Sequence, residues 1–451
     1  MDSNKQEKQY TLMTKTPIPK LIVKLAIPTT ISMLITNIYN LVDTAFVGKL
    51  GTSASGAVGI VFGFMMILQA VAFLFGQGSG SIMSRNLGKN DVKKASSIAS
   101  LGFFSALAGS ILAAIICLFT IDPLVVILGS TPTIAPFAKT YTIFILISAP
   151  AIVCSFVMNN LLRYEGKAML GMIGLSIGAV LNIAGDALLM FVFNMGIAGA
   201  GLSTCISQFI SFGILLSFFL RGKTICRLSI YNAAFNMSDF GDVFATGFPS
   251  LVRQGLQSLS TIVLNFFAGP YGDAAIAAMS IVSRIVFFVF SVVLGIAQGF
   301  QPVSAFNYGA KKYDRIREAF KFSILLSEVF IVVFSLIVII FSGNIIYRFR
   351  DDAEVVRIGT RALRLQCISQ IVTPFCTMTE MQLQSTGKKL LASITSFLKS
   401  GAIFIPALFI LANTRGLSGI QEAQPLATVV VVIPLIFFAK WFFKNLPKGD
   451  L

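Results

Sequence analysis

Long apolar segments recur along the whole chain and are separated by short polar loops. Each holds about 20 residues or more, which is the length that an α-helix needs to cross the hydrocarbon core of a bilayer. Twelve such spans are expected at 20–47, 54–82, 96–119, 135–160, 169–193, 198–220, 243–268, 274–304, 320–342, 358–383, 391–413 and 422–443. The alternating pattern of a membrane β-strand is absent from them, so we predict an all-α membrane protein.

The composition agrees with this interpretation and excludes several functions. Of 451 residues, 55% are apolar and 12% are charged, whereas soluble domains have about 25% charged residues. The sequence contains no histidine, which excludes imidazole bases and histidine metal sites. We see no nucleophile with a base, no metal-ligand spacing and no phosphate loop, so we expect neither an enzyme nor a bound cofactor.

The distribution of basic residues predicts the orientation of the spans. Of the 35 basic residues, 23 lie in the two tails and in the loops after the even-numbered spans. By the positive-inside rule both termini are cytoplasmic, and the net charge of +16 reports topology rather than a nucleic-acid surface. Arg348, Arg350 and Arg357 depart from the rule because they fall on the predicted outer side, close to Asp351, Asp352 and Glu354.

The two halves of the chain repeat each other at an offset of 221 residues. Residues 28–88 and 249–309 share 14 identities over 61 ungapped positions, among them Pro28 with Pro249 and Gly78 with Gly299. We therefore predict an N-terminal six-helix lobe at 1–221, a cytoplasmic linker at 222–242 and a C-terminal six-helix lobe at 243–451. Six spans per copy give parallel repeats, and two similar lobes around a cleft are typical of transporters that work by alternating access.

A few polar residues fall at membrane depth in the first lobe, where they are costly. Asp43 lies near the outer end of the first span, and Asp186 lies in the outer third of the fifth. Asn182 shares a helix face with Asp186, and Thr204 returns to similar depth in the sixth span. Such a cluster binds a proton or coordinates Na⁺ with Asp43 and Asp186, unless both aspartates are structural.

The second lobe has a different polar set, since Leu264 stands where the repeat has Asp43. Its candidate substrate or polar residues are Gln254, Gln257, Asn265, Arg284 and Glu380, and Glu380 suits an interfacial role as well as a ligand role. Glu328 and Lys399 are expected to form a structural ion pair. Pro28, inside the first span, is a candidate bending point because proline removes a helical hydrogen bond.

Several motifs together resemble the MATE (multidrug and toxic compound extrusion) transporters. The run NLVDTAFVGKLG at 40–51 is similar to their first span, and LNIAGDALLMF at 181–191 with GIAGAGLSTCIS at 196–207 is similar to their fifth and sixth spans. SIVSRI at 280–285 and QSTGKK at 384–389 fit their eighth span and the connection between spans ten and eleven. The ordered set covers nearly the whole chain and fits best the bacterial and archaeal branch with acidic residues in the N-terminal lobe.

The resemblance implies a V-shaped pair of six-helix bundles that exports organic cations in exchange for H⁺ or Na⁺. Asp43 and Asp186 would be the coupling carboxylates, Asn182 and Thr204 would complete their network, and Pro28 would bend the first span. We also expect a monomer in the cytoplasmic membrane of a bacterium or archaeon, with the lipid bilayer and small organic cations as partners and no nucleic acid. Ala187 replaces a proline of many relatives, and span seven lacks an acidic residue that some relatives carry, so coupling is expected in the first lobe.

One other function remains open on the sequence. A flippase for a lipid-linked precursor has the same general architecture, but it needs a cationic cavity for pyrophosphate. The candidate cavity residues here carry both signs, Arg253 and Arg284 against Asp43 and Asp186. This mixture favours the antiporter.

Overall fold

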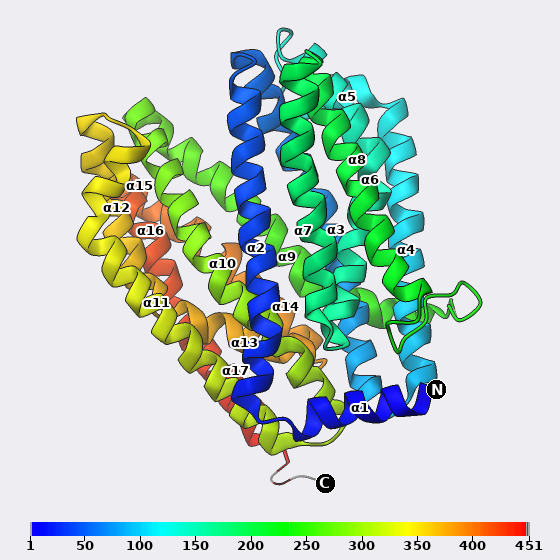
Figure 1. Ribbon diagram of the computed structural model, residues 1–451. Coiled ribbons are helices and arrows are strands. Elements are labelled where there is room, and N and C mark those ends of the chain that lie inside the picture. The colour runs from blue at the N-terminus through cyan, green and yellow to red at the C-terminus, as the bar shows by residue number, and fades with distance from the viewer. Residues whose placement is uncertain (1, 234, 448, 450–451) are drawn as a thin grey trace. The chain divides into compact units, whose positions relative to one another are not determined.

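The computed structural model describes residues 2–233, 235–447 and 449. These form helices joined by turns and, after Leu220, by a longer loop (Figure 1). Ten helices are long and apolar enough to cross a membrane by length and composition, counted over the described residues. The other two predicted spans correspond to α9 (Met237–Ala268), and to α12 (Ala353–Gln370) with α13 (Thr373–Ser385). The predicted all-α class with twelve membrane-spanning segments is confirmed.

Contacts divide the chain into two compact units, here called unit 1 and unit 2. Unit 1 comprises the residues up to Lys15 and Ile31–Leu251, and unit 2 comprises Thr16–Thr30 and the residues from Val252 onward. These bounds do not coincide with the expected lobes. The first part of α2 (Ile18–Gly48) belongs to unit 2, and the first part of α9 belongs to unit 1.

The other helices lie within one unit each. Unit 1 holds α1 (Asp2–Lys15), α3 (Thr52–Gly88), α4 (Val92–Phe119), α5 (Ile121–Ile127), α6 (Ala135–Tyr164), α7 (Ala168–Asp186), the π-helix η1 (Ala187–Val192) and α8 (Gly196–Leu220). Unit 2 holds the 3-10 turn η2 (Gly269–Tyr271), α10 (Asp273–Gly309), α11 (Tyr313–Phe349), α12, α13, α14 (Lys389–Phe397), the π-helix η3 (Leu398–Ala402), α15 (Phe404–Arg415), α16 (Leu417–Val430) and α17 (Val432–Lys444).

Three of the predicted spans are interrupted in unit 2. Span ten breaks between α12 and α13, and Pro374 lies in the first turn of α13, where its missing N–H removes no helical hydrogen bond. Span eleven contains the π-helix η3, and span twelve breaks at Val431, shortly before Pro434. The hydropathy pattern located these spans but not their breaks, because it depends on the side chains and not on the backbone hydrogen bonds.

Glycines allow the shared helices α2 and α9 to pack against their units. A Cβ on Gly78 of α3 would lie 2.2 Å from the carbonyl oxygen of Val243 in α9. At the repeat-related position, a Cβ on Gly299 of α10 would lie 2.7 Å from the backbone of Ala26 in α2. The repeat therefore preserves the same backbone-to-backbone crossing in both units, one between α3 and α9 and the other between α10 and α2.

The residues before the first span were predicted to be a polar tail, and in the structure they form the helix α1. Its side chains bond to three turns of unit 1: Lys5 donates to the carbonyl oxygen of Gly222 over 2.9 Å, Gln6 to that of Asn90 over 3.4 Å, and Gln9 to that of Glu165. These turns are the basic loops after spans two, four and six. They therefore lie on one face of unit 1 together with α1, as the charge pattern predicts for that half of the chain.

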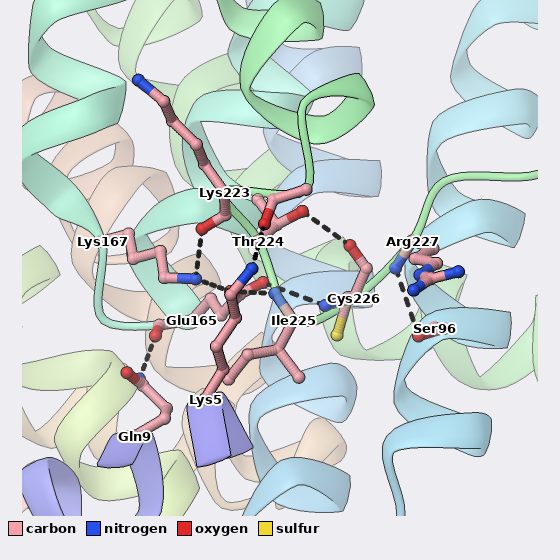
Figure 2. Close-up of polar contacts among 11 residues, drawn as sticks. Lys5, Gln9, Ser96, Glu165, Lys167, Lys223, Thr224, Ile225, Cys226 and Arg227 are labelled. Atoms are coloured by element: carbon pink, nitrogen blue, oxygen red, sulfur yellow. Dashed lines mark hydrogen bonds and ion pairs between the residues drawn. The ribbon is translucent and has the colours of Figure 1, made fainter. Parts of the chain in front are cut away.

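Glu165 ties two of these turns together (Figure 2). Its Oε1 accepts from Lys167 Nζ at 2.5 Å and from the backbone N–H of Ile225 at 2.6 Å, and its Oε2 accepts from the N–H of Cys226 at 3.4 Å. Burial raises the pKa of the Glu165 carboxyl above its ordinary value, while Lys167 and the two backbone N–H groups oppose that shift. The start of the linker is thus fixed to unit 1.

Candidate functional site

The predicted polar residues of the first lobe come together in unit 1. Asn182 and Asp186 lie one helical turn apart on α7, and Asn182 Nδ2 is 3.4 Å from Asp186 Oδ1. The same nitrogen is 3.1 Å from Thr204 Oγ1 and 3.4 Å from Ser203 Oγ on α8. The hydroxyl of Ser203 donates back to the carbonyl oxygen of Asn182 over 2.9 Å. This network joins α7 to α8 at the depth of Asp186.

A glycine brings the two helices close enough for these bonds. A Cβ on Gly185 would lie 2.5 Å from Ser203 Oγ, so a larger residue would displace the Ser203 hydroxyl from this network. Immediately after Asp186, α7 widens into η1, whose looser hydrogen bonding is frequent at functional sites. No pattern in the sequence indicates this change.

Asp43 comes to this site from α2. It is 9% exposed, and its charge interacts with that of Asp186. Two tyrosines that the sequence analysis missed also interact electrostatically with both carboxylates: Tyr39, one turn before Asp43 on α2, and Tyr141 on α6. Tyr141 is 1% exposed and shares a hydrogen bond with Thr204. Tyr39 could have been found from the sequence, because it lies four residues before Asp43 and so shares its helix face. Tyr141 could not, because only the fold brings α6 to this site.

The site contains buried acceptor oxygens that lack a donor. Oδ1 of Asp43, Oδ2 of Asp186 and Oδ1 of Asn182 are buried and have no hydrogen-bond partner among the described residues. A buried acceptor without a donor costs free energy, and a carboxylate costs more. Protons on the carboxyl groups would supply the missing donors, and a Na⁺ ion would accept the same oxygens as ligands. The residues present therefore fit a small cation.

Unit 2 contains a charged cluster in which the carboxylate is fully paired. Arg253 Nη1 on α9 donates to Glu380 Oε1 on α13 at 2.7 Å, and Ser396 Oγ donates to the same oxygen at 2.8 Å. Lys399 Nζ, in η3, lies 3.4 Å from Glu380 Oε2 and 2.8 Å from Thr377 Oγ1. Glu380 is fully buried. The expected pair of Glu328 with Lys399 is wrong, because Lys399 turns to Glu380.

The other candidate residues of unit 2 do not join this cluster through any hydrogen bond seen among the described residues. Gln254 and Asn265 on α9 are half-buried, and Gln257 on α9 and Arg284 on α10 are exposed. Arg253, the residue before Gln254, forms an ion pair with Glu380. The two polar clusters thus differ in chemistry. The carboxylates of Asp43 and Asp186 in unit 1 each have a buried oxygen without a donor, whereas Glu380 in unit 2 accepts from several donors.

Comparison with known proteins gives the family. The MatE family model matches the chain twice, over residues 28–188 and 249–410, in register with the internal repeat. The multidrug export protein MepA of Staphylococcus aureus (strain MSSA476) is 28% identical over 416 residues, covering 92% of each chain. MepA of Staphylococcus saprophyticus is also 28% identical, over 429 residues and 95% of each chain.

Solved structures share the fold over nearly the full length. A multidrug resistance MATE family transporter of the MOP superfamily, in an outward-facing conformation, superposes with a TM-score of 0.91 at 25% identity, covering 97% of this chain and 98% of that one. A MOP superfamily transporter from Pyrococcus furiosus, described as having a binding pocket of reverse polarity, gives 0.92 at 24% identity over 98% and 99%. The chain belongs to the MatE family of multi-pass membrane transporters.

Proposed function

We propose that this protein is a secondary antiporter that exports organic cations, including xenobiotics, in exchange for H⁺ or Na⁺ by alternating access. The observation that carries the proposal is the set of buried acceptor oxygens on Asp43, Asp186 and Asn182 that lack a donor. Relatives named multidrug export proteins over 92% of the chain support the xenobiotic substrate class.

The coupling step follows from electrostatics. With both carboxylates ionised, Asp43 and Asp186 repel each other at a buried site, so a proton or Na⁺ stabilises the network. Asn182 and Thr204 hold the geometry through the 3.1 Å contact between Nδ2 and Oγ1. When the coupling cation leaves, the site regains negative charge and favours the conformation that next admits a cation.

The donor-saturated cluster of unit 2 supports placing the coupling site in unit 1. Glu380 accepts from Arg253, Ser396 and Lys399, so it has little capacity left for an external cation. The alternative function, a flippase for a lipid-linked precursor, needs a cationic site for pyrophosphate. The two carboxylates at Asp43 and Asp186, each with a buried oxygen that lacks a donor, disfavour it.

The charge pattern supports an orientation with both termini in the cytoplasm, in a bacterial or archaeal cytoplasmic membrane. In unit 1 the basic turns lie on the face that carries α1. In unit 2, Arg317 at the start of α11 donates to the carbonyl oxygen of Leu446 over 2.8 Å, so the basic loop after α10 shares a face with the end of the chain. We propose that the protein works there as a monomer.

The test is efflux of a fluorescent organic cation from a drug-sensitive host and into inverted membrane vesicles. We expect Asp43→Asn and Asp186→Asn each to abolish ion-driven efflux at unchanged membrane abundance, because an amide cannot carry the coupling charge. Asp122→Asn is the matched control, since Asp122 is an exposed carboxylate of unit 1 that pairs with Lys139 outside the site. Replacing Na⁺ with K⁺ at fixed pH identifies the coupling ion. Full efflux from both site variants would refute the proposal.

A further inference from the structure

The arginines that depart from the positive-inside rule lie near the start of α12 in unit 2. Because α11 begins on the face of the C-terminus and its 37 residues span about 55 Å, it ends on the opposite face. The turn Arg350–Asp352 and the start of α12 therefore lie on that opposite face. Two more arginines follow on α12, Arg361 and Arg364. Nothing in the coupling site uses them.

Three of these arginines form a stripe along one exposed side of α12. Arg357, Arg361 and Arg364 are spaced by four and three residues, which places them on one helix face, and all are exposed. The other sides of α12 pack against α10, α11 and α16. Toward the middle of the membrane the same face continues with Ile368 and Ile371, which are 59% and 37% exposed. We call these five residues the α12 stripe.

The protein holds the guanidinium groups of the stripe in place. Arg361 donates to Ser418 Oγ and to Glu422 Oε1, both at 2.9 Å, and Arg415 holds the other oxygen of Glu422 at 2.8 Å. Arg364 Nε donates to Ser342 Oγ at 2.9 Å, a neutral partner, and no described carboxylate pairs with it. Arg357 is 3.7 Å from Glu354 at an exposed position, which is a weak pair. Arg357 and Arg364 thus keep charge available for a ligand.

The dimensions of the α12 stripe match one leaflet of a bilayer. From Arg357 to Ile371 the helix rises about 21 Å, which is half of the 40–45 Å bilayer including its headgroups. The arginines occupy the first 10 Å or so and the isoleucines the rest. A phospholipid has the same order, a charged phosphate followed by an apolar chain. The exposed isoleucines on this face are suited to packing against an acyl chain.

We propose that the α12 stripe binds an acidic phospholipid of the leaflet opposite the C-terminus, which is the outer leaflet in the proposed orientation. The phosphate accepts hydrogen bonds from Arg357 and Arg364, a geometry for which the planar guanidinium is suited, and one acyl chain lies along Ile368 and Ile371. The site is separate from the coupling carboxylates in unit 1, and lipid binding is measurable whether or not the protein transports anything.

Native mass spectrometry of the purified full-length protein, incubated with equal amounts of phosphatidylglycerol and phosphatidylcholine, tests the proposal. We expect the wild type to retain phosphatidylglycerol preferentially. Arg357→Gln/Arg364→Gln should lower that preference at least about fivefold, the worth of roughly one basic residue at an anionic membrane surface. The matched control, Arg348→Gln/Arg350→Gln, removes the same charge from the adjacent turn outside the stripe and should keep the preference.

Three outcomes would overturn the proposal. The first is equal retention of both lipids by the wild type, and the second is an equal loss in the stripe and control variants, which would indicate unspecific attraction. The third is stabilisation by free phosphate. We expect inorganic phosphate to raise the wild-type unfolding temperature no more than sulfate does at the same ionic strength. If phosphate raises it more, only when Arg357 and Arg364 are present and without any lipid preference, the stripe binds a soluble anion instead of a lipid.

Discussion

At the scale of single residues, the protein contains buried carboxylates in two opposite environments. Asp43 and Asp186 have oxygens without donors, and Glu380 accepts from two cations and a hydroxyl. The side chains have the same chemistry, so the difference comes from what the fold places beside them. A carboxylate without donors exchanges a cation readily, whereas one held by Arg253 is structural.

This contrast predicts opposite effects of neutralisation on stability. Glu380→Gln leaves Arg253 and Lys399 buried without their counter-charge, and we expect a loss of about 3–5 kcal/mol in the free energy of unfolding. Asp43→Asn removes a charge that has no partner, so the unfolding temperature should stay the same or rise. Thermal unfolding of both variants in one detergent measures the difference. Equal unfolding temperatures would contradict the assignment of Glu380 as structural.

At the scale of helices, close packing depends on glycines at the crossings. In unit 1 a Cβ on Gly247 of α9 would lie 1.8 Å from the carbonyl oxygen of Leu74 in α3, and its three nearest atoms all belong to the Leu74 backbone, which cannot rotate away. Gly63 lies on the same helix α3 with nothing within 4 Å of its Cβ position. The two glycines have the same helical propensity but opposite packing constraints.

We expect Gly247→Ala to lower the yield of folded protein sharply, because α3 and α9 must separate to admit the methyl group. Gly63→Ala should fold as well as the wild type or better, since alanine is favoured over glycine in a helix by up to about 1 kcal/mol. Size-exclusion chromatography of the two variants from parallel preparations compares the folded yields. A normal elution profile and yield for Gly247→Ala would show that the crossing tolerates a side chain.

At the scale of the whole molecule, two helices are shared between the units. The chain passes from unit 2 to unit 1 between Thr30 and Ile31 in α2, and from unit 1 to unit 2 between Leu251 and Val252 in α9. Pro28 and Pro249, related by the repeat, precede these two points by a few residues. Each proline removes one helical hydrogen bond, so the helices are weakest next to the points where they change units. The chain also changes units between Lys15 and Thr16, but that passage lies between helices, so α2 and α9 are the helices that a movement between the units would bend.

We therefore predict that Pro28→Ala and Pro249→Ala each slow efflux of an organic cation severalfold, with normal abundance and unfolding temperature, because the restored hydrogen bond stiffens the helix. Pro150→Ala is the matched control: Pro150 also lies inside a long helix, α6, but that helix stays within unit 1. Initial efflux rates in inverted vesicles provide the measurement. Rates at the wild-type level in both variants would rule out these prolines as bending points.

The sequence by itself determined the class of protein, the twelve spans and the repeat, because hydropathy and span length follow directly from the side chains. It also selected Asp43, Asp186, Asn182 and Thr204, since polar residues are rare and costly inside apolar segments. For Asn182 and Asp186, helical spacing was enough to predict their contact.

Only the tertiary structure decided which groups meet between segments distant in the chain. It paired Lys399 with Glu380 rather than Glu328, brought Tyr141 to the proposed coupling site, and assigned the first parts of α2 and α9 to the opposite units. These contacts depend on which helix faces touch and on glycines that let backbones approach, and hydropathy is insensitive to both. The sequence predicted that Arg357 lies on the outer side, against the positive-inside rule, and the fold showed that it shares an exposed face with Arg364 and Ile368.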